Sequence, residues 1–289
     1  MERSIYDQIK RALRKLGRRR QTRRHRYTDA GILEVYIWAA LHDRPVSWAC
    51  CAENWPRGTR RGPLPDASTV SRRMRSPQII RLIERLRLAV RPREHRALVA
   101  IIDGKPLVVS PNSHDRQSGF GYGAGRMVKG YKMHVVIDTN AHVLDWRVTP
   151  MNTDERLMAR RILANLSHAG YVLGDCQYSA NSIFKVAEER GMQLVAPRYP
   201  SQRGKALGHR KHTEGRRRSI QLLEGPNRAF ARALMKQRWG IERYFGQLTS
   251  APGSLAALPS WVRGWRRVRN WVAIKLTIHA ARQALTHSK

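Results

Sequence analysis

The spacing of hydrophobic residues along this 289-residue chain changes from a helical period to a strand-like one near residue 97. Before that point apolar residues recur every three or four positions, which is typical of amphipathic helices. Residues 29–55 predict two helices, and residues 66–90 predict a short helix followed by a longer one. We therefore expect an entirely helical N-terminal region.

The pattern after residue 97 predicts strands that first pair as a hairpin and then alternate with helices. The continuous apolar run 97–102 is long enough for a strand and too short for a helix. Further strands are predicted at 131–138, 143–148, 170–175 and 193–196, and helices at 153–168, 181–190 and 226–248. This order indicates an α/β fold with a mixed sheet flanked by helices.

The composition adds a strong electrostatic constraint. The chain has 55 Lys and Arg against 21 Asp and Glu, which gives a formal charge of +34, and 42% of its residues are hydrophobic. The apolar content excludes a disordered basic tail, and the charge favours a polyanionic partner, because basic side chains that neutralise phosphates release counterions. No apolar stretch approaches the roughly 20 residues that cross a bilayer, and the N-terminus lacks a secretory signal. The three cysteines form no metal or disulfide motif and indicate a reducing cytosol.

The short helix that follows Asp66 carries small polar and basic side chains. Those expected to contact DNA are Ser68, Thr69, Arg72 and Arg73. Short helices joined by tight loops favour a helix-turn-helix, in which such side chains contact phosphates and base edges. A plain helical subdomain with a basic solvent face is the alternative interpretation.

In a chain so poor in acids, the positions of three carboxylates suggest catalysis. Asp103 and Asp175 each end a predicted strand, and Glu242 lies on a predicted helix, one turn after Arg238. Two acids at neighbouring strand ends repel each other unless a cation lies between them. Such a set can bind two Mg²⁺ ions roughly 4 Å apart for phosphoryl transfer. The alternatives are Asp residues at turns or helix caps, and a surface ion pair between Arg238 and Glu242.

These residues also lie in segments that resemble the DDE insertion-sequence transposases of bacteria, in the insertion-sequence-4/5-like superfamily. The resemblance covers roughly residues 96–250, in IIDGKPL, KGYKMHVVIDTNAHVLDWRVTPMNTDE, GYVLGDCQYSA and RWGIERYFGQL. RPVSWACCAENWP and LPDASTVSRRMR resemble the DNA-binding region of that group more loosely. The resemblance implies a ribonuclease-H-like fold, a Mg²⁺-dependent active site and cut-and-paste DNA movement. It also implies that Asp103, Asp175 and Glu242 bind the metals.

One branch of that family surrounds its glutamate with Y-x2-R-x3-E-x6-K, whose Tyr and Lys hold DNA near the cleaved end. Here Arg238 and Glu242 match, but the Tyr and Lys positions are Met235 and Thr249. The resemblance therefore carries no expectation of a hairpin intermediate.

Other basic residues of the second region are expected to contact DNA. Lys129 and Lys132 follow a Gly-rich loop, and Arg203, Arg216 and Arg217 lie in a basic loop at 201–218. Ordinary exposed strand lysines are the alternative for the first two. Three tryptophans near the C-terminus alternate with arginines and are expected to form the core side of an amphipathic helix rather than a base-stacking surface, namely Trp261, Trp265 and Trp271.

We expect a basic arm at 1–28, a helical DNA-binding region at 29–95, and a catalytic domain at 96–289 that ends in a helix at 259–286. The predicted reaction is Mg²⁺-dependent cleavage at inverted-repeat ends followed by strand transfer into target DNA, with Mn²⁺ able to substitute. We expect a homodimer on double-stranded DNA, no membrane contact and a cytoplasmic, nucleoid-associated location in bacteria. The alternatives are a domesticated DDE-type nuclease without strand transfer and a non-enzymatic nucleic-acid-binding protein.

Overall fold

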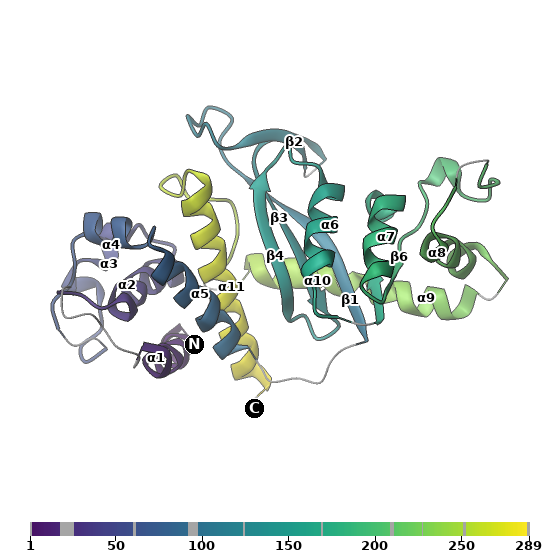
Figure 1. The fold of residues 1–289 in the computed structure, drawn as a ribbon. Helices are drawn as coiled ribbons and strands as arrows, with labels where there is room; N and C mark the ends of the chain where they lie inside the picture. The colour runs from purple at the N-terminus through teal and green to yellow at the C-terminus, as the bar shows by residue number, and fades with distance from the viewer. Residues whose placement is uncertain are drawn as a thin grey trace. The chain divides into compact units, whose positions relative to one another are not determined.

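The chain forms two compact units in its computed structural model (Figure 1). The structure describes residues 2–17, 26–59, 62–91, 98–123, 125–168, 170–208, 211–226, 228–250 and 253–287. The first unit comprises Met1–Arg93 and Gln247–Lys289, and the second comprises Glu94–Gly246. Among the described helices, none has the length and apolar character needed to span a membrane.

The first unit is helical, and both ends of the chain contribute to it. Its helices are α1 Glu2–Gly17, α2 Asp29–Leu41, α3 Val46–Ala49, α4 Ala67–Arg73, α5 Pro77–Val90 and α11 Trp265–His287. Helices α2 and α11 carry buried residues on nearly all sides, from Ile32 to Leu41 and from Val268 to Ala281. They therefore form the centre, and α1 and α5 pack against them.

Buried polar groups attach α11 to its neighbours. The fully buried Lys275 donates from Nζ to the carbonyl oxygen of Ala40 at 2.6 Å and forms an ion pair with Asp43. Asn270 donates from Nδ2 to the carbonyl oxygen of Met74 at 2.8 Å. These partners offset the free-energy cost of placing an amide and an ammonium among apolar side chains.

Two predicted domain boundaries differ from the structure. The arm predicted at 1–28 contains α1, whose buried Ile5 and Ile9 form part of the helical core. The predicted C-terminal helix at 259–286 begins at Trp265 and packs against α1, α2 and α5, because its apolar surface requires cover on all sides. Residues 18–25 of the arm and the boundary near residue 95 lie outside the described residues.

The second unit is built on a mixed sheet, as the sequence predicts, and the described residues form six strands, of which β2 was not predicted. Its strands are β1 Val99–Val108, β2 Gly119–Gly123, β3 Arg126–Asp138, β4 Val143–Pro150, β5 Gly170–Leu173 and β6 Met192–Val195. The order is β2-β3-β1-β5-β6, and β4 also pairs with β3. Strand β1 is antiparallel to β3 and parallel to β5, which is parallel to β6.

Strand β3 organises one half of this sheet. Its first residues pair with β2, and the residues from Tyr131 onward pair with β4. Gly130 lies where the partner changes, and a Cβ atom there would approach the carbonyl oxygen of Leu107 to 2.2 Å. This position therefore requires glycine.

Helices cover both faces of the sheet. They are α6 Glu155–Asn165, α7 Asn181–Glu189, α8 Glu214–Glu224, α9 Arg228–Lys236 and α10 Trp239–Ser250. Helices α6 and α7 lie side by side over one face and bury Ile102, Val136 and Phe184 (Figure 1). Ile101 points to the opposite face, where a Cβ atom on Gly240 of α10 would lie 3.6 Å from it.

Three local expectations in this unit were wrong. Strand β1 continues past Asp103 to Val108, because β3 pairs with it along that whole length. The helix predicted at 226–248 is two helices, separated by a turn at Gln237 and Arg238. The basic loop predicted at 201–218 ends early, because Thr213 caps α8 and accepts a hydrogen bond from the backbone of Arg216.

Candidate active site

Two carboxylates come together where the pairing between β1 and β5 ends. The last paired residues are Ile101 and Leu173. Asp103 on β1 and Asp175 just after β5 each lie two residues further along the chain. They are close enough for the charge of Asp175 to act on Asp103. The two acids are therefore neighbours, but Asp103 lies within β1 and not at the end of a strand, where the sequence analysis expected it.

Local backbone groups hold each carboxylate in place. Oδ1 of Asp103 accepts a hydrogen bond from the N–H of Gly104 at 2.7 Å. Asp175 caps the short 3-10 helix Cys176–Tyr178, where its Oδ1 accepts from the N–H of Gln177 at 2.8 Å. The two acids are thus oriented by the chain next to them.

The electrostatic environment disfavours negative charge on both acids. Burial raises the pKa of Asp103 to about 6, against the hydrogen bond from Gly104, and the charge of Asp175 adds to the rise. Burial also raises the pKa of Asp175, while its hydrogen bond from Gln177 and the charge of Arg238 lower it. Half-buried carboxylates that repel each other form a site that a cation would stabilise.

Arg238 connects this pair to the third predicted acid. It lies in the turn between α9 and α10, and its Nη1 is 3.7 Å from Oδ2 of Asp103. Its Nη2 is 3.4 Å from Oε1 of Glu242, whose side chain is 63% exposed. The guanidinium thus contacts both carboxylates. Glu242 is linked to the aspartates through this arginine.

The oxygen ligands of the pair suit a hard divalent cation. Mg²⁺ is commonly held by one or two carboxylates together with substrate phosphate oxygens, and Asp103 and Asp175 present such a pair. Among the described residues, no three His, Cys, Asp or Glu side chains form a group ready to hold a metal ion. The two aspartates fit the metal, and Glu242 would have to turn away from Arg238 to join them.

A further carboxylate close to the pair was missed by the sequence reasoning. Glu155, at the start of α6, acts electrostatically on both Asp103 and Asp175. It forms an ion pair with Lys132 of β3, whose side chain is 10% exposed. A Cβ atom on Gly104 would lie 3.2 Å from Cδ of Lys132, so the absence of a side chain there leaves room for this lysine. The sequence predicts only that a helix begins near residue 153, and nothing in that pattern indicates that Glu155 lies near the two aspartates.

Tyr178 is the other residue near the acids that sequence reasoning missed. Its side chain is 1% exposed, and its hydroxyl has no hydrogen-bond partner among the described residues. Burial raises its pKa, and the charges of Asp103, Glu155 and Asp175 raise it further. The hydroxyl is therefore protonated and lies near the carboxylates.

The residues predicted to contact DNA divide into accessible and engaged groups. Several present exposed side chains, namely Ser68, Arg72, Arg203 and Arg217. Thr69 and Lys129 are half-buried, and Lys129 donates from Nζ to the carbonyl oxygen of Ser113 at 2.6 Å.

Three other predicted contacts are occupied within the protein. Arg73 forms an ion pair with Asp29, and Arg216 donates from Nη1 to Oδ1 of Asn181 at 3.1 Å. Lys132 was expected to reach DNA phosphate, but it is buried against Glu155. In this structure the positive charge of Lys132 compensates the negative charge of Glu155.

Comparison with known proteins identifies the class. Residues 94–280 match the family described as "Transposase DDE domain". The fold is similar to that of a piggyBac transposase in a cryo-EM structure of its synaptic complex with hairpin DNA, with a TM-score of 0.52 and 8% sequence identity. That similarity covers 98% of this chain and 72% of the other. Among curated proteins, no sequence gives a significant match.

The family match extends over most of the chain, so this chain belongs to the transposase DDE domain family. Its class is therefore that of the transposases, which act in DNA transposition and recombination. The match includes Asp103, Asp175, Arg238 and Glu242 and continues into α11.

Proposed function

We propose that this protein is a bacterial insertion-sequence transposase of the insertion-sequence-4/5-like superfamily, which cleaves the inverted-repeat ends of its element and joins them to target DNA. The observation that carries the proposal is the pairing of Asp103 and Asp175, both with raised pKa values, beside Arg238. The strand order, with β1 between antiparallel β3 and parallel β5, supports a ribonuclease-H-like fold.

In this proposal Asp103 and Asp175 are metal ligands, and Glu242 completes the set after it leaves Arg238. Two Mg²⁺ ions, for which Mn²⁺ can substitute, would activate the attacking oxygen and stabilise the leaving oxygen of the phosphodiester. Arg238 is half-buried and lies beside these acids, so its guanidinium can turn from Glu242 to a DNA phosphate.

The basic surface of the proposed function has two parts. In the helical unit, α4 exposes Ser68 and Arg72, with Thr69 beside them, as a DNA-contacting helix of a helix-turn-helix requires. In the second unit, Lys129, Arg203 and Arg217 supply contacts to phosphates. A homodimer would hold both element ends, and such a protein would act at the nucleoid in the cytoplasm.

The proposal is tested with the full-length protein and the DNA that flanks its coding sequence on both sides. We expect cleavage with Mg²⁺ or Mn²⁺, and no cleavage with EDTA. Asp103→Asn should abolish cleavage and retain DNA binding. Asp7→Asn, at an exposed acid on α1, is the matched control and should cleave normally.

The products separate the alternatives. Cleaved ends joined to a target plasmid support the transposase. Cleavage without joining indicates a DDE-type nuclease, and DNA binding that Asp103→Asn leaves unchanged, without cleavage in any metal, indicates a non-enzymatic DNA-binding protein. Cleavage that persists in EDTA contradicts the metal-dependent mechanism.

A further inference from the structure

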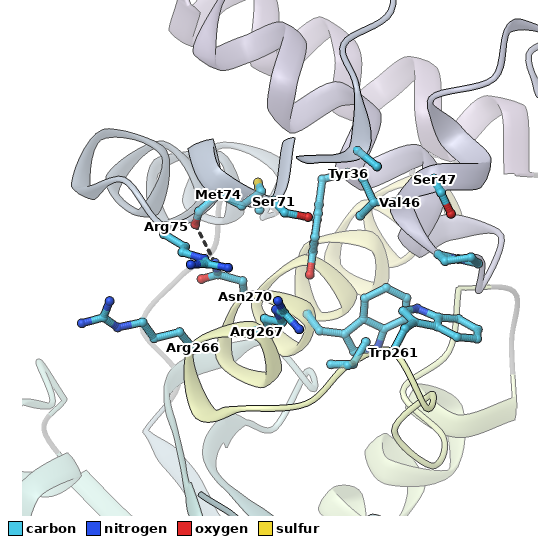
Figure 2. Close-up of a pocket in the computed structure, with 14 residues that line it drawn as sticks. Tyr36, Val46, Ser47, Ser71, Met74, Arg75, Trp261, Arg266, Arg267 and Asn270 are labelled. Atoms are coloured by element: carbon cyan, nitrogen blue, oxygen red, sulfur yellow. Dashed lines mark hydrogen bonds between the residues drawn. The ribbon is translucent and has the colours of Figure 1, made fainter. Parts of the chain in front are cut away.

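A cavity of about 270 Å³ lies within the helical unit. None of the proposed metal ligands Asp103, Asp175 and Glu242 lines it. Residues of α2, α3 and α4 line one side, and the segment from Trp261 into α11 lines the other (Figure 2). Its walls include the aromatic rings of Tyr36, Trp261 and Trp271. Trp261 precedes α11 and is 41% exposed, so the expectation that it lies on the core side of the C-terminal helix is wrong, and an aromatic surface remains accessible at this cavity.

The cavity also concentrates positive charge. Arg75, Arg266 and Arg267 line it, and its lining contains no Asp or Glu. Arginines close to them in sequence have acidic partners: Arg73 pairs with Asp29, and Arg269 pairs with Glu84.

Arg75, Arg266 and Arg267, by contrast, form no ion pair with any residue in the described part of the chain. Three exposed guanidinium groups around one cavity repel each other, and an anion bound between them would relieve this repulsion.

The other polar groups in the lining suit a ligand that has an aromatic ring with hydrogen-bonding atoms at its edge. In Figure 2 the hydroxyl end of Tyr36 points toward Arg267. Burial raises the pKa of Tyr36, with Arg267 opposing the rise, so this hydroxyl stays protonated and can donate. Ser47 and Ser71 add two more hydroxyl groups to the lining. Asn270 holds the end of α4 against α11 by its hydrogen bond to Met74.

We propose that this cavity binds one nucleoside phosphate, with the base against Trp261 and Tyr36 and the phosphate on Arg75, Arg266 and Arg267. Aromatic rings stack on any base, and arginine forks match phosphate oxygens. The volume lies just below the roughly 300–1,000 Å³ of pockets that bury one drug-sized ligand, so it has room for no more than one nucleotide. The nucleotide is either free or part of a single DNA strand.

The experiment measures binding to the full-length protein by calorimetry and tryptophan fluorescence. The probes are deoxyadenosine monophosphate, inorganic phosphate, a single-stranded oligonucleotide and the same oligonucleotide as a duplex. Saturable binding of the monophosphate supports a free nucleotide as ligand. Binding of the single strand alone supports a nucleotide within DNA. Inorganic phosphate that binds as tightly as the nucleotide contradicts the role of the aromatic wall.

Matched variants locate the binding. Trp261→Ala should weaken nucleotide binding about tenfold, as expected for loss of one base-stacking contact. Arg267→Gln should weaken it at least as much, whereas Arg85→Gln, at an exposed arginine outside the cavity, should leave it unchanged. Equal binding by Trp261→Ala, Arg267→Gln and the wild type overturns the assignment. Asp103→Asn should bind nucleotide normally, so failure here and failure of the proposed catalysis are distinguishable.

Discussion

Arg238 places Nη1 3.7 Å from Oδ2 of Asp103, although the two residues are far apart in the chain. The arginine comes from the turn between α9 and α10, and the aspartate comes from the middle of β1. Because burial and the charge of Asp175 raise the pKa of Asp103, this contact opposes an unfavourable accumulation of negative charge. The spacing of four residues in the sequence predicts that Arg238 is close to Glu242, but only the fold brings Arg238 close to Asp103.

Replacing this arginine tests its role in catalysis. We expect Arg238→Gln to reduce DNA cleavage about 100-fold, the usual effect of losing one donor that stabilises developing charge. The side chain is half-buried in a turn, so the variant should fold. Cleavage rates under single-turnover conditions provide the measurement, and Arg232→Gln, at an exposed arginine on α9, is the control. A rate equal to that of the wild type in Arg238→Gln would exclude a catalytic role.

The raised pKa of Asp103 predicts a pH-dependent stability in the absence of metal. The ordinary value is 3.8 and the folded value is about 6, so the folded state binds more protons in this window. The free energy of unfolding should therefore decrease as the pH rises from about 4 to about 6. Asp103→Asn should remove up to about 3 kcal/mol of this decrease, as measured by urea denaturation in EDTA. Identical pH profiles for variant and wild type would contradict the prediction.

Metal binding by the same pair predicts a stability effect without any activity assay. At pH 7, Mg²⁺ should raise the melting temperature of the wild type, because a ligand that binds only the folded state stabilises it. Asp175→Asn should lose the increase, and Asp7→Asn should keep it. An equal increase in all three proteins would show that Mg²⁺ acts elsewhere.

The ion pair between buried Lys132 and half-buried Glu155 predicts a structural rather than a DNA-contacting role for the lysine. Lys132→Met leaves Glu155 uncompensated near Asp103 and Asp175 and should lower the free energy of unfolding by about 3 kcal/mol. Adding Glu155→Gln should restore most of that loss. The salt dependence of DNA binding should not change in Lys132→Met. A salt dependence reduced by about one phosphate contact would instead support the original expectation.

Lys275 predicts a second pH effect, in the helical unit. Burial lowers its pKa from 10.5 to about 8, while the hydrogen bond to Asp43 opposes the shift. The unfolded state therefore binds more protons between pH 8 and 10.5, and the free energy of unfolding should rise across that range by up to about 3 kcal/mol. Chemical denaturation of Lys275→Met should show a flatter profile, and a profile as steep as that of the wild type would refute this interpretation.

The pattern of the chain predicted the mixed sheet because alternation and apolar runs report directly on which faces of a strand are buried. The apolar run that leads into Asp103 and the short segment that ends at Asp175 were recognised as strands for this reason. Local pattern did not predict the length of β1, because Gly104, Lys105 and Pro106 interrupt the apolar run after Asp103 and become part of a strand only by pairing with β3. The break before α10 was missed because no proline or glycine precedes Arg238 within that turn.

By itself, the sequence determined the electropositive character, the α/β class and the small number of acids available for chemistry, since these depend on composition and on local periodicity. Only the tertiary structure decided which charges are neighbours. It brought Glu155 and Tyr178 close to the two aspartates, withdrew Lys132 from the surface and grouped α11 with the N-terminal helices. It also left Arg75, Arg266 and Arg267 around one cavity without acidic partners in its lining. Electrostatic energy depends on distance in space, and charged residues that are far apart in the sequence come close together only when the chain has folded.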